Sequence, residues 1–209
     1  MKTVISQNKK ITAAFIGDSI TYGYPYGPEY SWVGLLQKNM HCNLEAINLG
    51  INGDSLMDMH RRFIRDVLRH KPTFVHILGG SNDAWLNNDP VHSQKAVDEM
   101  VGQCRDAGIK PVIGLTTPLC HNPSGGSSFI PFGAEEMMLW LDQFREWLKY
   151  YTSSKSIPLI DYYTALCLPG TGRGNPVYFY DECHLNHRGN KVMAQLTGRK
   201  LKEIINSIN

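Results

Sequence analysis

The chain carries the segment Ile11-Thr12-Ala13-Ala14-Phe15-Ile16-Gly17, followed directly by Asp18-Ser19-Ile20-Thr21. The first segment is mostly apolar and ends at a glycine, as in a strand that is buried within a parallel sheet. The polar tetrapeptide then follows at the carboxyl end of the strand, which is where open α/β sheets bind their ligands. A serine there can be presented as a nucleophile, although taken alone Ser19 and Thr21 also fit a turn that merely caps a helix. The far end of the chain favours the nucleophile.

The rest of the chain alternates short apolar runs with longer amphipathic ones, a pattern typical of βαβ units. We expect an α/β fold, a three-layer αβα sandwich around a five-stranded parallel sheet. Strands are predicted near residues 11–16, 44–48, 73–79, 110–116 and 157–161. The spacing of apolar residues predicts helices over Ser31–His41, Ser55–His70, Val91–Ala107, Ala134–Tyr151 and Asn186–Ile208.

No repeat, linker or change in composition divides the 209 residues, so we expect a single domain over residues 1–209. A chain of this length buries one core without disulfides or a structural metal. Residues 117–133 and 168–180 are rich in proline and glycine and are predicted to be surface loops. We expect these loops to shape the mouth of a site.

Charge is nearly balanced in this chain, with a formal net charge of +2. Its basic residues are spread along the sequence, so we expect no nucleic acid partner. Four arginines recur along one predicted helix, interleaved with acidic residues, and we interpret them as its solvated face. These residues are Arg61, Arg62, Arg65 and Arg69.

The five cysteines are scattered and include no CxxC pair, which predicts neither a disulfide framework nor a zinc site. Reduced thiols are the default in a cytoplasmic protein, and we expect this location. Residues 1–10 lack the apolar region of a signal peptide, and no apolar run approaches the length of a membrane span. We expect no stable membrane insertion, and the sequence leaves a homo-oligomer open.

Near the other end of the chain, Asp181-Glu182-Cys183-His184 places a carboxylate three residues before an imidazole. In a turn, this spacing lets the carboxylate reach back to the imidazole, fix its tautomer and stabilise its protonated form. A weak hydroxyl nucleophile needs such a base and such an orienting group. Taken alone, the pair also fits a structural histidine beside a local carboxylate. Together with Ser19 it predicts a Ser/His/Asp hydrolase.

Two further polar segments follow predicted strands. In Asn48-Leu49-Gly50-Ile51-Asn52-Gly53-Asp54-Ser55, backbone N–H groups near Gly53 would be free at the start of a helix, where they can stabilise an oxyanion. An ordinary capped turn is the alternative. The segment Leu78-Gly79-Gly80-Ser81-Asn82-Asp83 offers the side chain of Asn82, a neutral amide donor that can point at negative charge.

Ser81 is a competing nucleophile in this last segment. It ranks below Ser19 because Asn82 takes the donor role beside it, and adjacent side chains on an extended segment face opposite ways. Asp18 and Asp83 are interpreted as structural residues that hydrogen-bond the loops carrying their neighbours.

No Gly-x-Ser-x-Gly motif occurs in the chain, which disfavours the usual α/β-hydrolase fold. The four polar segments, in their order, resemble those of the GDSL or SGNH hydrolase family. The resemblance runs from Gly17 to His184, with Ile20 where the family name has Leu. It implies a flavodoxin-like sheet, activity on esters, and neither a metal nor an organic cofactor. The family's residues match Ser19, Gly53, Asn82 and His184, with Asp181 as the third member of the triad.

We therefore predict a serine ester hydrolase that acts through an acyl-enzyme on a small-molecule ester. Ser19 would attack the acyl carbon, His184 would take and return its proton, and Asp181 would orient the imidazole. The oxyanion would be bound by the N–H groups of Ser19 and Gly53 and by the side-chain amide of Asn82.

Aromatic residues near these segments suit a sugar or a short acyl group, although several of them can equally pack against the sheet. We expect a short-chain acyl ester, either an acetylated carbohydrate or a lysophospholipid. Substrate contacts are predicted for Tyr22, Trp85 and Tyr180, within an aromatic rim that also includes Tyr24, Tyr26 and Phe179.

Two alternatives use the same segments. A metal-dependent phosphoesterase gives no role to the serine, glycine or asparagine. A flavodoxin-like binding module would hold a phosphate or nucleotide on Gly79-Gly80-Ser81-Asn82, although no phosphate-loop lysine follows these glycines. The ligands of the phosphoesterase would be Asp18, Asp83, Asp181 and His184.

Overall fold

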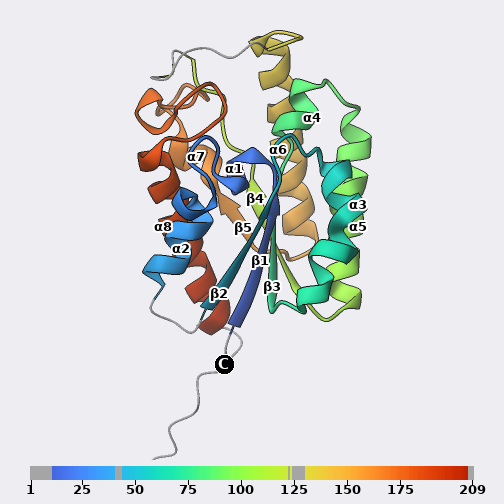
Figure 1. The fold of residues 1–209 in the computed structure, drawn as a ribbon. Helices are drawn as coiled ribbons and strands as arrows, with labels where there is room; N and C mark the ends of the chain where they lie inside the picture. The colour runs from blue at the N-terminus through green and yellow to red at the C-terminus, as the bar shows by residue number, and fades with distance from the viewer. Residues whose placement is uncertain (1–10, 41–43, 122, 124–129, 207–209) are drawn as a thin grey trace, which may run out of the picture.

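A five-stranded parallel sheet forms the centre of the structure, a computed structural model that describes residues 11–40, 44–121, 123 and 130–206 (Figure 1). The strands lie in the order β2-β1-β3-β4-β5, and every pairing between neighbours is parallel. The predicted five-stranded parallel sheet is therefore confirmed. The strands are β1 (Ile11–Gly17), β2 (Leu44–Gly50), β3 (Phe74–Leu78), β4 (Lys110–Leu115) and β5 (Leu159–Asp161).

Helices cover both faces of this sheet, as Figure 1 shows, so the predicted three-layer arrangement is also confirmed. One layer contains α2 (Trp32–Asn39), α7 (Tyr162–Leu166) and α8 (His187–Asn206). The other contains α3 (Leu56–Asp66), α5 (Pro90–Asp106) and α6 (Ala134–Ser154). The predicted ends of two helices, at residue 41 and at residues 207–208, lie outside the described residues. No helix in the described ranges is long and apolar enough to cross a membrane.

Short helices at the strand ends are the main difference from the predicted elements. Helix α1 (Ser19–Tyr22) follows β1, α4 (Ser81–Trp85) follows β3, and α7 follows β5. A helix of four or five residues is too short to show the apolar repeat on which the prediction rests. Short 3₁₀ helices at Pro28–Tyr30 and Pro176–Tyr178 escape prediction for the same reason. The end of the helix predicted over Ser55–His70 is instead a separate 3₁₀ helix, Leu68–His70.

The sheet separates two apolar clusters, and β1 contributes to both. Ala14 and Ile16 belong to the cluster with α3, α5 and α6, whereas Ala13 and Phe15 belong to the cluster with α2 and α8. Burial on both faces explains why the apolar run of β1 is almost continuous. The one core that we expected is therefore divided by the sheet.

The register of the strands brings the carboxyl ends of β1, β2 and β3 together. Gly17 pairs with Gly50 of β2 and with Leu78 of β3. The lack of a side chain at Gly50 allows α1 to approach closely, since a Cβ atom there would lie 2.2 Å from the backbone nitrogen of Tyr22. The polar segments that follow these three strands therefore start side by side.

We expect the Gly50→Ala variant to lose about 1–3 kcal/mol of unfolding free energy, because the added methyl group forces α1 away from the end of β2. Urea unfolding followed by circular dichroism measures this loss. Gly102→Ala is the matched control, because Gly102 lies within α5 and a Cβ atom there would have no neighbour within 4 Å. This control should gain about 0.5–1 kcal/mol from its higher helix propensity. Equal effects of the two substitutions would contradict the close approach at Gly50.

Candidate active site

Ser19 is positioned by the turn that joins β1 to α1. Asp18 caps α1, with its carboxylate oxygen Oδ1 accepting a hydrogen bond of 2.8 Å from the N–H of Ile20. Ser19 is the first residue of α1, and Gly23 ends this helix in the left-handed conformation, with φ of 98°. The turn thus presents the partly buried Ser19 hydroxyl at the carboxyl edge of the sheet.

Asp181 and His184 form a compact turn before α8. The Oδ1 atom of Asp181 accepts hydrogen bonds from the backbone N–H groups of Cys183, at 2.9 Å, and His184, at 2.7 Å. Asx turns of this kind arise from short side chains that replace a backbone acceptor. The other carboxylate oxygen, Oδ2, lies 2.7 Å from Nδ1 of His184. The three-residue spacing therefore does bring the carboxylate to the imidazole.

Neighbouring segments hold this turn in place. The N–H of Tyr180 donates to the carbonyl of His184, and the N–H of Cys120 donates to the carbonyl of Glu182, both at 2.8 Å. Helix α8, which begins at His187, is tied to α2 because the side-chain oxygen of Asn190 accepts from the N–H of Trp32 at 2.8 Å. The turn that carries the imidazole is thus held by neighbouring backbone and by the more distant Cys120.

The hydroxyl of Ser19 lies 2.8 Å from Nε2 of His184, although the two residues are 165 positions apart. Burial raises the pKa of Asp181, but hydrogen bonds from His184 and Cys183 lower it by more than burial raises it. The pKa therefore lies below its ordinary value. The carboxylate is therefore ionised at neutral pH and accepts a hydrogen bond from the N–H at Nδ1, so the proton stays on the imidazole. This leaves Nε2 as an acceptor for the serine hydroxyl, the tautomer that a general base requires.

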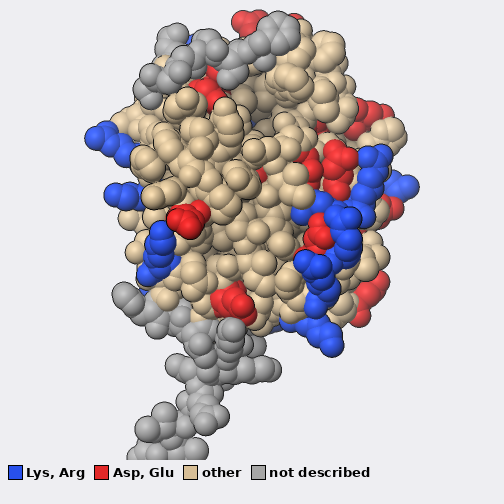
Figure 2. All heavy atoms as spheres, viewed as in Figure 1, with Lys and Arg blue, Asp and Glu red and all other residues tan. Residues whose placement is uncertain are grey.

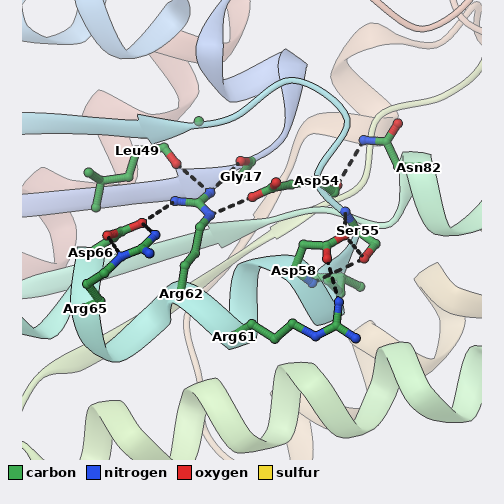
Figure 3. A network of polar contacts seen from close by, with 12 residues as sticks. Gly17, Leu49, Asp54, Ser55, Asp58, Arg61, Arg62, Arg65, Asp66 and Asn82 are labelled. Carbon is green, nitrogen blue, oxygen red and sulfur yellow. Dashed lines mark hydrogen bonds and ion pairs between the residues drawn. The ribbon is translucent and has the colours of Figure 1, made fainter.

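Asn82 and the turn at Gly53 lie next to each other. The side-chain nitrogen of Asn82 donates to the backbone carbonyl of Asp54 at 2.9 Å (Figure 3), and this leaves its second amide hydrogen for another acceptor. Gly53 has φ of 86°, which favours glycine. Helix α3 begins at Leu56 with Ser55 as its cap, so Gly53 belongs to the preceding turn and not to the helix start that we predicted.

The structure corrects the argument by which Ser81 was set aside. Ser81 and Asn82 are the first residues of α4, not an extended segment, so their side chains do not simply alternate. Ser81 is buried, and the serine that hydrogen-bonds to His184 is Ser19. The preference for Ser19 therefore rests on this contact.

Asp18 hydrogen-bonds the backbone of its own turn, as the sequence predicts, whereas the contacts of Asp83 reach two helices. Asp83 accepts from the N–H of Leu56 at 3.0 Å and from the hydroxyl of Ser93 at 2.7 Å, which joins α4 to α3 and α5. Burial raises the pKa of Asp83. Burial also raises the pKa of Asp18 to about 7, and its Oδ2 atom has no hydrogen-bond partner within the described part of the chain.

These carboxylates are also the ligands of the phosphoesterase alternative. Within the described ranges, no group of three or more His, Cys, Asp or Glu side chains is arranged to hold a metal ion.

The cysteines at positions 104, 120, 167 and 183 are free, and Cys42 lies outside the described residues.

Of the aromatic residues near these segments, some make ring contacts around His184 and Tyr180, and one lies in the core. The ring of Tyr24 lies 4.6 Å from the ring of His184, measured between centroids, and the ring of Tyr26 lies 6.1 Å from that of Tyr180. Phe179 is fully buried in the cluster beneath α8, so its predicted place on the rim is wrong. Tyr22, the last residue of α1, is partly buried, and Trp85, the last residue of α4, is 37% exposed.

Sequence reasoning missed Arg62. We interpreted all four arginines of this region as a solvated face, and Figure 2 does show basic side chains gathered over α3 with acidic ones between them. Arg61 and Arg65 are exposed and pair with Asp58 and Asp66, respectively. Arg62, however, is only 7% exposed and points towards the ends of β1 and β2 (Figure 3). Its place on the inner face of an amphipathic helix was the available signal.

Comparison with known proteins links the whole arrangement to one family. The model of the GDSL-like Lipase/Acylhydrolase family matches residues 15–192. The acetylxylan esterase of Geobacillus stearothermophilus is 29% identical over 166 residues, which cover 70% of this chain and 74% of that protein. The uncharacterised lipoprotein YqeF of Bacillus subtilis is 26% identical over 166 residues, covering 69% of this chain and 68% of that protein.

A solved structure agrees with the fold. The crystal structure of a GDSL-like lipase from Bacteroides thetaiotaomicron matches with a TM-score of 0.77 at 20% identity. The match covers 94% of this chain and 90% of that one. At this identity the likeness shows a shared fold.

We expect the burial of Asp18 to make stability depend on pH. Because its pKa is about 7 in the folded protein and 3.8 is the ordinary value, the folded state keeps a proton that the unfolded chain loses. The free energy of unfolding should therefore fall as pH rises from about 4 to about 7. Asp18→Asn should remove the part of this fall that Asp18 causes, and it should keep the cap, because the amide oxygen also accepts from the N–H of Ile20.

Urea unfolding of both proteins at pH 4 and pH 8 measures the effect. The two should be about equally stable at pH 4, and Asp18→Asn should be more stable by about 2–4 kcal/mol at pH 8. A difference that does not change with pH would contradict the raised pKa.

Proposed function

The chain belongs to the GDSL-like lipase/acylhydrolase family, and we propose that it is a serine ester hydrolase that acts through an acyl-enzyme. The proposal rests on one observation, the continuous hydrogen-bond chain from the Ser19 hydroxyl through His184 to Asp181, with distances of 2.8 and 2.7 Å. A serine hydroxyl is a weak nucleophile, and a neutral imidazole within hydrogen-bond distance activates it.

In the proposed reaction, the Ser19 oxygen attacks the acyl carbon while Nε2 of His184 takes the hydroxyl proton. The imidazolium then returns this proton to the leaving alcohol, and the acyl group remains on the serine. In the second half, water attacks the acyl-enzyme with His184 again as the base. The bond to the serine oxygen then breaks, the imidazolium returns its proton to that oxygen, and the carboxylic acid is released. Asp181 stabilises the imidazolium in both halves, because it is ionised and holds the proton on Nδ1.

Negative charge on the acyl oxygen would be stabilised by three donors. Ser19 lies at the start of α1, where backbone N–H groups have no partner within the helix. Gly53 lies in the turn beside Asp54, whose carbonyl already binds one hydrogen of the Asn82 amide. The second hydrogen of that amide is then the donor to the oxyanion.

For the substrate we propose a small ester with a short acyl group, with an acetylated carbohydrate ahead of a lysophospholipid. Two observations support this order. Tyr24 places its ring against His184, and an aromatic face near the catalytic base suits a sugar ring. A relative of this chain is an acetylxylan esterase. Hydrolysis rates across nitrophenyl esters of rising acyl length test the choice, and a maximum at long chains would favour the lipid.

Ser19→Ala should abolish ester hydrolysis and leave the fold intact, because it removes the nucleophile and, of the hydrogen bonds described above, only the partly buried one to His184. The expected loss of kcat is about 10⁴-fold or more. A fluorophosphonate probe, followed by peptide mass mapping, should label the wild-type chain at Ser19. Ser81→Ala is the control and should keep both activity and labelling.

Two outcomes would overturn the assignment of Ser19. One is labelling at Ser81, and the other is full activity of Ser19→Ala. Excess EDTA distinguishes the phosphoesterase alternative, since a loss of activity that a divalent metal restores would favour it.

Asn82→Ala should lower kcat by roughly 10²–10³-fold with KM nearly unchanged, because an oxyanion donor acts mainly on the transition state. Asn82→Asp should be at least as damaging, since it places a negative charge where an anion forms. Steady-state kinetics on nitrophenyl acetate measure both constants. A raised KM with an unchanged kcat would instead identify Asn82 as a residue that binds the substrate in its ground state.

A further inference from the structure

We propose that Arg62 is a positioning residue that sets the orientation of the Asn82 amide through Asp54. The proposal rests on the ester hydrolase function proposed above and adds to it a group that touches neither the substrate nor the nucleophile. Figure 3 shows the guanidinium of Arg62 at the centre of the network that it forms with Gly17, Leu49 and Asp54.

One guanidinium reaches three separate segments of the chain. Its Nε donates to Oδ2 of Asp54 at 2.6 Å, and its Nη2 donates to the carbonyls of Leu49, at 2.8 Å, and Gly17, at 3.2 Å. Gly17 ends β1 two residues before Ser19, and Leu49 lies near the end of β2. The contacts therefore fix the ends of the neighbouring strands β1 and β2 relative to each other.

Asp54 passes this constraint on to the oxyanion site. Its side chain is bound by Arg62, while its backbone carbonyl accepts the hydrogen bond from Asn82. Both hydrogens of the Asn82 amide are on the same nitrogen. The hydrogen that is bound to the Asp54 carbonyl therefore determines the direction of the second hydrogen, which is the one proposed to bind the oxyanion. A displaced Asp54 would let the amide rotate, and an oxyanion donor that is misplaced by about 1 Å loses much of its effect.

The environment of the Arg62 and Asp54 pair favours a rigid arrangement. Their side chains are 8% and 12% exposed, so water does not compete strongly for these hydrogen bonds. Arginine provides its donors in a fixed planar fork, whereas lysine provides one compact charge on a flexible stem. Lysine at position 62 would keep the charge but could not hold the three acceptors in one geometry. Arg62→Lys therefore tests positioning and not charge.

Arg61 provides a matched control on the same helix. It is exposed and, within the described part of the chain, it pairs with Asp58 of its own helix. Arg61→Lys makes the same chemical change one residue away. We expect its kcat and KM to stay within about twofold of wild type, as is usual for exposed ion pairs.

The test is a double-mutant cycle on nitrophenyl acetate, with kcat and KM measured for Arg62→Lys, Asn82→Ala and the combined variant. Arg62→Lys should lower kcat about tenfold or more, with KM within about twofold of wild type. In the Asn82→Ala background the same substitution should lower kcat by no more than about twofold, because the amide through which it acts is gone. Asp54→Asn should behave in the same way, and it carries the cycle if Arg62→Lys does not fold.

Each other outcome overturns the inference. Arg62 has no positioning role if Arg62→Lys matches Arg61→Lys. If the combined variant loses kcat by the product of the two single losses, Arg62 acts on the fold and not through Asn82. These failures leave the proposed function standing as long as Ser19→Ala is inactive. Activity that survives Ser19→Ala overturns both proposals.

Discussion

The parallel pairing of β1 with β2 on one side and β3 on the other is the constraint on which the rest of the structure depends. Parallel strands end at the same edge of a sheet, so the segments that leave these three strands must start together. Gly17 lies opposite both Gly50 and Leu78. The turn at Asp54 and helix α4 then remain close enough for a direct hydrogen bond between Asp54 and Asn82.

The imidazole reaches the same edge by a different route. Its turn lies after the last strand and depends on distant anchors, among them the contact between Trp32 of α2 and Asn190 of α8. The pairing of His184 with Asp181 is local, whereas its contact with Ser19 requires α8 to be packed against the sheet. Loss of helix packing would therefore separate the serine from its base while leaving each local motif intact.

Buried ionisable side chains are concentrated around the strand ends. Burial raises the pKa values of Asp18, Asp54 and Asp83, and Arg62 lies buried among the same loops. Hydrogen bonds to backbone N–H groups and to the guanidinium offset part of the cost of removing these charges from water. Such groups are unfavourable for stability taken alone, and proteins tolerate them where geometry has to be held for function.

The sequence by itself determined the features whose causes lie within a few residues. These are the alternation of apolar strands with amphipathic helices, the turn that joins Asp181 to His184, and the order of motifs that marks the family. The sequence also predicted that Ser19 and His184 act together, and the tertiary structure brings their side chains to hydrogen-bond distance. Only the tertiary structure decided that Arg62 points inward and that Phe179 is core. Short helices such as α1 and α4 also emerged only there. The reason is physical: burial and the approach of distant segments depend on how complete helices pack on the sheet, which no short stretch of sequence contains.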